Sequence, residues 1–371
     1  MKIAIFSSTI DVKDGYGNMT YEFCSQLLKK GIDFVLFLPR AAASDQKFPF
    51  PVEYLLPEYI FRIKTPKFMP YIFSGLDLKE FTLVHSLFDF PYAFYAARLA
   101  KRHKLPFIMG AQGTYGVLPL TYWPEKYLLK IAYRLAKVVI VPSKFTKDQI
   151  LYYARENYNI EVIHNGVNFS RFNQEVDISD LKEKYKDQQI ILTVGGLKNR
   201  KGQDLVIKAL PKVKKFFPNI KYLIVGNGSW REHLENLVKE NSLDKKVEFL
   251  GAVNNEELVR YFKLADVYVH TPRVINLNFE GFGIVYLEAS ACAKPIVATD
   301  AGGVRDAIVD GQTGFVVSDG DIEAIADKVI FLLSNDKISK EMGDAGLAYA
   351  KQHDWPIVTQ KFIEQYQKYS L

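Results

Sequence analysis

Short apolar runs alternate with amphipathic stretches along the whole chain. The runs are rich in β-branched and aromatic residues, which is typical of strands that are buried on both faces of a sheet. In the first half, the predicted strands are residues 3–6, 34–38, 83–85, 107–109, 138–141 and 162–163. Between them, apolar residues recur at helical spacing, most clearly at residues 20–30, directly before Gly31, and at residues 122–136.

The same alternation starts again in the second half. Its predicted strands are residues 190–194, 222–225, 247–250, 267–269, 296–298 and 315–317. Its predicted helices are residues 205–217, 230–241, 256–265, 285–293 and 322–333. Two consecutive series of strands and helices predict an α/β protein with two doubly wound parallel sheets. We therefore expect a first domain at residues 1–167, a polar linker with a short helix at 168–185, and a second domain at 186–352.

Length and composition agree with two globular domains. The chain has 371 residues, 48% of them hydrophobic and 24% charged, so each domain can bury its own core. No apolar run is long enough to predict a spanning helix, and residues 1–9 read as a buried strand rather than a signal peptide. Cys24 and Cys292 are predicted to be buried free thiols in a reducing compartment, and no cysteine or histidine cluster has the spacing of a metal site.

The net charge of +6 is unevenly distributed, because the first half holds the excess of lysine and arginine. Such a half can face nucleic acid, a membrane surface or an anionic acceptor. The chain contains no recognisable nucleic-acid-binding module, so we expect no nucleic-acid partner. Residues 48–76 and 122–134 combine aromatic and basic side chains, which suits a membrane interface, although an ordinary basic surface over buried aromatics explains them at least as well. The basic residues of these stretches are Arg62, Lys64, Lys67, Lys126, Lys130 and Arg134.

Glycines follow the first strand of each domain. Gly15 and Gly17 lie in a predicted loop, where they either shape a turn or let the backbone approach an anion at the next helix. Gly195 and Gly196 begin the segment GGLKNRKG at the end of residues 190–194.

The charges of that segment suggest a phosphate-binding loop. Arg200 and Lys201 supply positive charge next to glycines, although a solvated basic loop is the alternative. Gly226 and Asn227 follow the next strand in the same way. Because ligands of doubly wound sheets bind outside the carboxyl ends of the strands, we expect one site there, in the cleft between the two domains.

The stretch NFEGFGIVYLEASA carries two glutamates eight positions apart. Glu280 precedes Gly281, Phe282 and Gly283, whose amides can point towards an anion at the N-terminus of the following helix. Glu288 lies two turns into that otherwise apolar helix. A carboxylate there is costly unless it is paired or accepts ligand hydroxyls, and a ribose diol would suit it. An N-terminal glutamate followed by a salt-bridged one is the structural alternative.

These motifs together resemble the retaining GT-B glycosyltransferases of glycosyltransferase family 4, also called glycosyl transferases group 1. The resemblance covers nearly all of residues 160–355 and runs through GGLKNRKGQD, LIVGNGSW, VEFLGAV and NFEGFGIVYLEASA. The two glutamates with EGFG are its most specific motif, and each of the others alone is weaker. It implies a GT-B fold, in which two Rossmann-like, doubly wound parallel-sheet domains face each other across a cleft. Residues 353–371 resemble the family's C-terminal helix, which crosses back onto the first domain.

The resemblance also implies a role for each residue of these motifs. Glu288 would bind the ribose of a nucleotide-diphosphate sugar, Glu280 would position the transferred sugar, and Lys201 would neutralise the leaving diphosphate. The catalytic set is therefore predicted as Glu280, Lys201 and Gln112. The predicted donor-binding residues are Gly15, Gly17, Gly195, Gly196, Arg200, Gly226, Asn227, Val253, Gly281, Phe282, Gly283, Ile284, Val285 and Glu288.

Two positions depart from the family pattern. The family usually has an arginine at the position of Gly196, so one cation that clamps the diphosphate is missing and Arg200 is a candidate substitute. It also usually has a histidine where this chain has Gln112, which cannot take a proton. A front-face mechanism, in which the leaving phosphate acts as the base, does not require that histidine.

The predicted function is retaining, metal-independent transfer of a hexose from a nucleotide-diphosphate sugar to an acceptor hydroxyl, in cell-envelope, lipopolysaccharide or exopolysaccharide synthesis. No cofactor is expected besides the nucleotide sugar as co-substrate. The predicted acceptor is a saccharide or a lipid-linked molecule, and the predicted location is the cytoplasm, including peripheral contact with the inner face of the membrane. A catalytically silent scaffold that binds the sugar nucleotide is the alternative.

Overall fold

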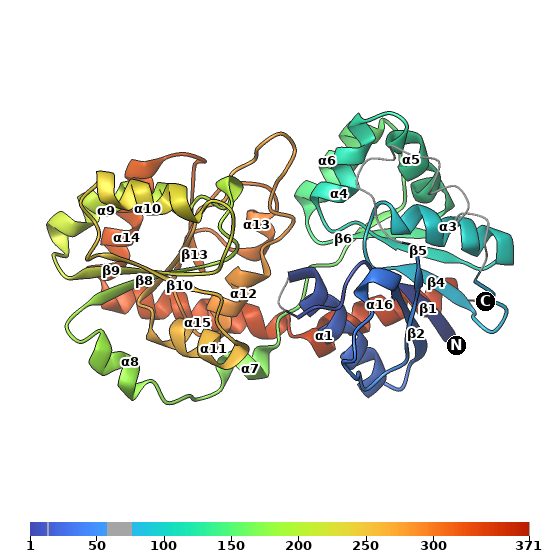
Figure 1. Ribbon diagram of the computed structural model, residues 1–371, viewed down its shortest axis with the longest axis horizontal. Helices are drawn as coiled ribbons and strands as arrows, with labels where there is room; N and C mark the ends of the chain where they lie inside the picture. The colour runs from blue at the N-terminus through green and yellow to red at the C-terminus, as the bar shows by residue number, and fades with distance from the viewer. Residues whose placement is uncertain (13–14, 58–75, 371) are drawn as a thin grey trace. The chain divides into compact units, whose positions relative to one another are not determined.

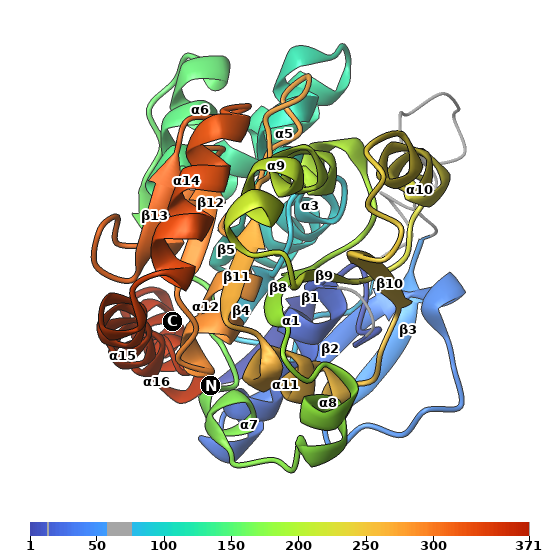
Figure 2. The same cartoon turned by 90° about the vertical axis from the view of Figure 1, so that its left-hand side faces the viewer.

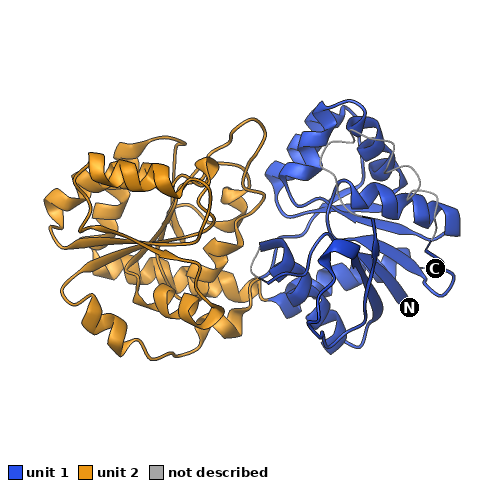
Figure 3. Cartoon of the chain, in the orientation of Figure 1, with its two compact units in different colours: residues 1–166, 355–371 blue, residues 167–354 orange. Residues whose placement is uncertain are grey.

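A computed structural model of the chain describes residues 1–12, 15–57 and 76–370 (Figure 1). The chain divides into two compact units, which Figure 3 colours separately. Unit 1 consists of Met1–Gly166 and Trp355–Leu371, and unit 2 of Val167–Asp354. Among the described residues, no helix combines the length and the apolar character that crossing a bilayer requires.

Unit 1 is built around a seven-stranded parallel sheet with the order β3-β2-β1-β4-β5-β6-β7. The strands are β1 (Lys2–Phe6), β2 (Asp33–Pro39), β3 (Val52–Leu56), β4 (Leu83–Ser86), β5 (Phe107–Gly110), β6 (Val138–Val141) and β7 (Ile160–Val162). The helices are α1 (Gly15–Lys29), α3 (Tyr92–His103), α4 (Thr114–Val117), α5 (Glu125–Leu135), α6 (Lys144–Ala154) and α16 (Trp355–Tyr369), with short 3-10 turns at η1 (Arg40–Ala42) and η3 (Leu118–Thr121). Helix α16 packs on α1, because Phe362 and Tyr366 join Phe23 and Leu27 in one buried core.

Unit 2 has a six-stranded parallel sheet with the order β10-β9-β8-β11-β12-β13. Its strands are β8 (Gln189–Val194), β9 (Ile220–Val225), β10 (Val247–Gly251), β11 (Val267–His270), β12 (Ile296–Thr299) and β13 (Gly314–Val317). Its helices are α7 (Phe169–Asn173), α8 (Ser179–Lys184), α9 (Gln203–Phe216), α10 (Arg231–Glu240), α11 (Asn255–Leu264), α12 (Ile284–Ala291), α13 (Val304–Ala307), α14 (Ile322–Leu333) and α15 (Asp336–Gln352), with a 3-10 turn at η4 (Asn199–Lys201).

Helices cover both faces of the second sheet, as Figures 1 and 2 show. Along β8, Ile190 and Leu192 face a core that α11, α12 and α15 complete, whereas Ile191 faces a core with α9, α10 and α14. Both faces of the strand are therefore buried, which is why the sequence shows a continuous apolar run. The strand order reverses between β8 and β11, and in such sheets this is the place where ligands bind.

The structure corrects three expectations about the first half. Strand β3 was not predicted, and β7 begins two residues before the predicted run. The glycines Gly15 and Gly17 belong to the first turn of α1 rather than to a loop before it. Residues 58–75 of the aromatic and basic stretch, which include Arg62, Lys64 and Lys67, lie outside the described residues.

The segment predicted as a linker packs against unit 2. Phe172 of α7, Leu181 of α8 and Tyr185 are all buried in the core beneath the second sheet. The chain passes from unit 1 to unit 2 at Gly166, before this segment begins.

Candidate functional site

The loop after β8 carries two cations on a tight turn at the carboxyl edge of the second sheet. Arg200 and Lys201 occupy η4, and Gly202 ends that turn with a φ of +73° before α9 begins. A Cβ atom on Gly202 would lie 1.7 Å from the carbonyl oxygen of Thr271, which follows β11. Glycine is therefore required both for the backbone angle and for the close approach of these two loops.

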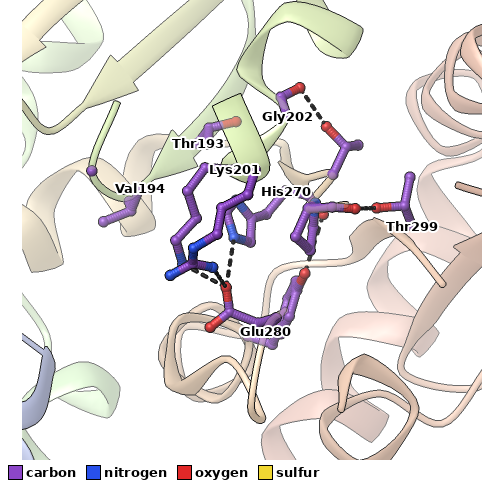
Figure 4. A network of polar contacts seen from close by, with 12 residues as sticks. Thr193, Val194, Lys201, Gly202, His270, Glu280 and Thr299 are labelled. Atoms are coloured by element: carbon purple, nitrogen blue, oxygen red, sulfur yellow. Dashed lines mark hydrogen bonds and ion pairs between the residues drawn. The ribbon is translucent and has the colours of Figure 1, made fainter. Parts of the chain in front are cut away.

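The carboxylate of Glu280 forms ion pairs with both cations. Its Oε2 atom lies 2.5 Å from Nζ of Lys201 and 3.2 Å from Nη1 of Arg200. Nε2 of His270, at the end of β11, lies 3.9 Å from the same oxygen. Figure 4 shows Lys201, His270 and Glu280 pointing towards one another. We refer to Arg200, Lys201, His270 and Glu280 as the Glu280 cluster.

Burial shapes the electrostatics of the cluster. Burial alone would raise the pKa of Glu280, but the charge of Lys201, the approach of His270 and the charge of Arg200 hold it well below its usual range. Glu280 is therefore ionised at neutral pH. Burial lowers the pKa of His270 to about 4, despite the neighbouring carboxylate, so this imidazole is neutral.

The sequence analysis did not identify His270 as a candidate. The side chain is fully buried, and neither ring nitrogen has a hydrogen-bond partner among the described residues. Such unsatisfied groups are uncommon in folded proteins and often mark functional positions. The signal in the sequence is weak, because His270 reads as the last residue of an ordinary buried strand.

Arg273 was also missed, and it braces the turn that carries the two cations. Its guanidinium lies 2.7 Å from Oδ1 of the buried Asp204 and 3.2 Å from Oδ1 of Asn199, while its amide donates to the carbonyl of Arg200 at 2.8 Å. These contacts join the loop after β11 to both ends of η4. Only the tertiary structure brings these residues together.

The backbone around Glu280 is held by close contacts. The Glu280 carbonyl accepts a hydrogen bond from the amide of Gly303 at 2.7 Å, and a Cβ on Gly302 would lie 2.3 Å from that carbonyl oxygen. Gly283, with a φ of +88°, precedes α12, and a Cβ there would lie 2.5 Å from the ring of Tyr286. The positions predicted to contact an anion, Gly281, Phe282, Gly283, Ile284 and Val285, therefore lie directly before α12 or in its first turn.

Glu288 is buried in the second turn of α12. Burial, and then the charge of the nearby Glu288, raises the pKa of the Tyr268 hydroxyl well above its usual range. The Glu288 carboxylate therefore lies near Tyr268, in the buried part of unit 2.

The remaining glycines of unit 2 pack against each other at the same edge of the sheet. Gly195 follows β8, and its amide donates to the carbonyl of Val225 at 2.9 Å. Gly226 has a φ of +135°, and a Cβ there would lie 2.1 Å from the carbonyl oxygen of Gly195. By contrast, a Cβ on Gly196 would meet only the Asn227 carbonyl oxygen, at an ordinary 3.7 Å. Position 196 therefore has room for a Cβ atom.

Three of the predicted residues belong to unit 1, separately from the Glu280 cluster. Gly17 makes room for the backbone of Asp11, whose carbonyl oxygen would lie 2.0 Å from a Cβ, whereas Gly15 faces open space. Gln112 follows β5 and is buried, and its backbone amide donates a hydrogen bond to Oδ2 of Asp89 at 3.0 Å. Burial raises the pKa of Asp89 to about 7.

In unit 2, Val253 follows β10 and packs half-buried against the core.

Two family profiles cover most of the chain. The profile described as Glycosyltransferase Family 4 matches residues 13–171, and the one described as Glycosyl transferases group 1 matches residues 176–348. A GDP-mannose-dependent alpha-(1-6)-phosphatidylinositol monomannoside mannosyltransferase of Mycolicibacterium smegmatis is 34% identical over 220 residues. That match spans 58% of this chain and 58% of the relative's length.

Solved structures match the whole chain. The sucrose-phosphate synthase of Thermosynechococcus elongatus has a TM-score of 0.81 at 20% identity, with 99% of both chains covered. Anabaena HepE in complex with UDP has a TM-score of 0.79 at 20% identity and covers 99% of this chain and 100% of its own. These similarities establish the GT-B fold, with its two parallel-sheet α/β domains.

Proposed function

This chain belongs to glycosyltransferase family 4, and on that premise we propose that it transfers a sugar from a nucleotide-diphosphate sugar to an acceptor hydroxyl with retention of configuration. The observation that carries the proposal is the Glu280 cluster. Two cations lie half-buried or deeper at the carboxyl edge of a doubly wound sheet, next to glycine turns and directly before a helix. This is the environment that a diphosphate requires.

In the proposed mechanism, Lys201 and Arg200 bind the diphosphate, and the amides of Phe282, Gly283 and Ile284 stabilise its developing charge. Each well-placed donor of this kind contributes ~3 kcal/mol to transition-state stabilisation. Because these side chains supply positive charge, no metal ion or further cofactor is needed. Glu288 accepts hydrogen bonds from the ribose hydroxyls, as one carboxylate can accept from a diol.

The chemical step exchanges one bond at the anomeric carbon. The acceptor oxygen forms a bond to this carbon on the face from which the diphosphate leaves, and the bond to the phosphate oxygen breaks. The acceptor proton passes to the leaving phosphate, since Gln112 has no group that can take it. Glu280 positions the sugar during this exchange.

The nucleotide base is the first property to determine. The mycobacterial relative is named for GDP-mannose, whereas HepE was crystallised with UDP and with UDP-glucose. We would measure the melting temperature with UDP, GDP, ADP, CMP and TDP, and then with the matching sugar nucleotides, because a ligand of the folded state raises it. A rise with one diphosphate, followed by transfer from its sugar nucleotide, supports the proposal. Binding without donor hydrolysis or transfer would support a scaffold role instead, and no rise with any nucleotide would refute the diphosphate site.

Replacing Gly196 with arginine should increase the affinity for nucleoside diphosphates about tenfold, because one additional charged hydrogen bond contributes roughly this much. A Cβ atom fits at this position, and the family usually carries an arginine there. Isothermal titration calorimetry with UDP and GDP measures the effect. Gly196→Gln, which has a long but neutral side chain, is the control. Equal affinities of the arginine variant and the wild type would show that this position does not face the diphosphate.

We propose a lipid-linked or saccharide acceptor of the cell envelope and peripheral contact with the cytoplasmic face of the membrane. The supporting surface lies before and within α5, where Trp123 is 78% exposed, Tyr127 is exposed and Lys126 lies 4.9 Å from the Tyr127 ring centroid. Exposed aromatic and basic side chains together suit the headgroup region of an anionic bilayer.

Trp123→Ser should therefore lower partitioning onto vesicles of phosphatidylglycerol and phosphatidylethanolamine about tenfold, because the variant lacks the indole ring that makes apolar contact with the lipids. Co-sedimentation with the vesicles measures this partitioning. Tyr152→Ser, at another exposed aromatic residue of unit 1, is the matched control. If both variants bind the vesicles as the wild type does, this surface does not contact the membrane.

A further inference from the structure

The Glu280 carboxylate occupies the place of a ligand anion. A single oxygen of this side chain, Oε2, contacts both Lys201 and Arg200, at 2.5 and 3.2 Å. These are the two cations that the proposed function assigns to the diphosphate. We propose that Glu280 competes with the diphosphate for Lys201 and Arg200, and thereby makes the site bind the sugar donor in preference to the nucleoside diphosphate product. This inference rests on the proposed function.

The competition follows from the burial of the ion pair. The side chains of Lys201 and Glu280 are only 15% and 13% exposed, so water screens their attraction weakly. A diphosphate must replace the Glu280 carboxylate at Lys201, or share the cation with it while both negative charges remain close together. Either arrangement costs free energy, which lowers the affinity for the diphosphate part of any ligand.

The transferred sugar changes this balance. When the complete donor is bound, sugar hydroxyls can donate hydrogen bonds to the displaced Glu280 carboxylate and so replace part of what it loses at Lys201. The product diphosphate has no sugar and leaves the carboxylate without these donors. Glu280 then returns to Lys201, which favours release of the product.

His270 provides a second partner for the displaced carboxylate. Its ring is neutral and fully buried, its two nitrogens have no hydrogen-bond partner among the described residues, and Nε2 is 3.9 Å from Oε2 of Glu280. A movement of about 1 Å would bring this pair to hydrogen-bond distance. The Glu280 backbone carbonyl accepts a hydrogen bond from the Gly303 amide, which holds the backbone from which the side chain would move.

The test compares the affinities of wild type and Glu280→Gln for UDP and GDP by calorimetry. Without the competing charge, the affinity for the preferred diphosphate should increase about tenfold. The affinity for the corresponding sugar nucleotide should increase less or decrease, because the sugar loses its charged acceptor. UMP and GMP should bind both proteins similarly.

The matched control is Glu323→Gln. Glu323 also forms an ion pair with a lysine, Lys212, but it lies on the exposed surface of unit 2.

A double variant separates competition from a change in folding. Glu280→Gln leaves a buried lysine without its partner, so its melting temperature should be measured first. When Lys201→Met is already present, adding Glu280→Gln should increase the diphosphate affinity less than it does in the wild type, because only Arg200 remains for the carboxylate to compete for. Unchanged or weaker diphosphate binding by a folded Glu280→Gln protein would overturn the inference. Failure of the wild type to bind any diphosphate would instead overturn the proposed function.

Discussion

Replacing Lys201 with alanine should lower kcat by about 100- to 1,000-fold, which is the usual cost of removing one group that stabilises a developing negative charge. The reason is the position of the ammonium group, which is buried 2.5 Å from Glu280 and carried by a turn that Arg273 and Gly202 hold in place. Affinity for the donor should fall less than kcat, because the charge on the leaving diphosphate grows as the bond to the sugar breaks. Steady-state kinetics with the donor identified by the melting-temperature screen measures both quantities.

The matched control is Lys198→Ala, which removes an exposed lysine from the same loop. This variant should retain kcat within a few-fold, since exposed charges are screened by water and salt. If Lys201→Ala and Lys198→Ala have equal kcat values, Lys201 does not act on the leaving group, and the assignment of the diphosphate site is wrong.

Replacing Glu288 with alanine should weaken nucleoside diphosphate binding by about 10- to 100-fold, because hydrogen bonds to a charged acceptor contribute about 1.5–3 kcal/mol. Glu288 is buried in α12, and the proposed function assigns its carboxylate to the ribose hydroxyls. In contrast to the Lys201 variant, kcat at saturating donor should change little, since the ribose interaction is similar before and during the reaction. Calorimetry with the preferred diphosphate measures the loss of affinity.

A 2′-deoxy analogue of the same diphosphate sharpens this experiment. The wild type should bind the analogue more weakly than the ribonucleotide, whereas Glu288→Ala should bind the two alike, because the group that distinguishes them is gone. A variant that still discriminates between them would show that another residue reads the ribose and that Glu288 has a structural role. Its melting temperature identifies any general loss of stability.

The central strands of both sheets were predictable because a strand that is buried on both faces forms a continuous apolar run in the sequence. Strands such as β6 and β8 have neighbours on both sides and helices on both faces, so nearly every position must be apolar. In the second sheet, β9 begins two residues before its predicted run. In the first sheet, the errors fall on β3 and β7, its edge strands. Exposed positions alternate along β3, and β7 has only three residues, so neither forms the run that was used to find the others.

For the candidate site too, the sequence indicated some residues, whereas their contacts became known only from the structure. Lys201, Glu280 and Glu288 were selected from the sequence as candidates. The first two are charged residues beside glycines, as in anion-binding loops, and the third is a carboxylate within an apolar helix, which is costly without a ligand or a partner. That Lys201 and Glu280 are each other's partners was not predictable, since 79 positions separate them. The roles of His270 and Arg273 also depend on loops that meet only when β8 and β11 pair in the sheet.

By itself, the sequence determined the two series of strands and helices, the family and the charged residues that are candidates for the site. The strands, the helices and the candidate charges follow from local composition and spacing, which a linear chain displays directly, whereas the family follows from the resemblance of its motifs. The tertiary structure alone decided which charges neutralise each other, which glycines are required by neighbouring backbone, and that a Cβ atom fits at position 196. Such properties depend on distances between distant loops, and packing of the sheet and its helices sets those distances.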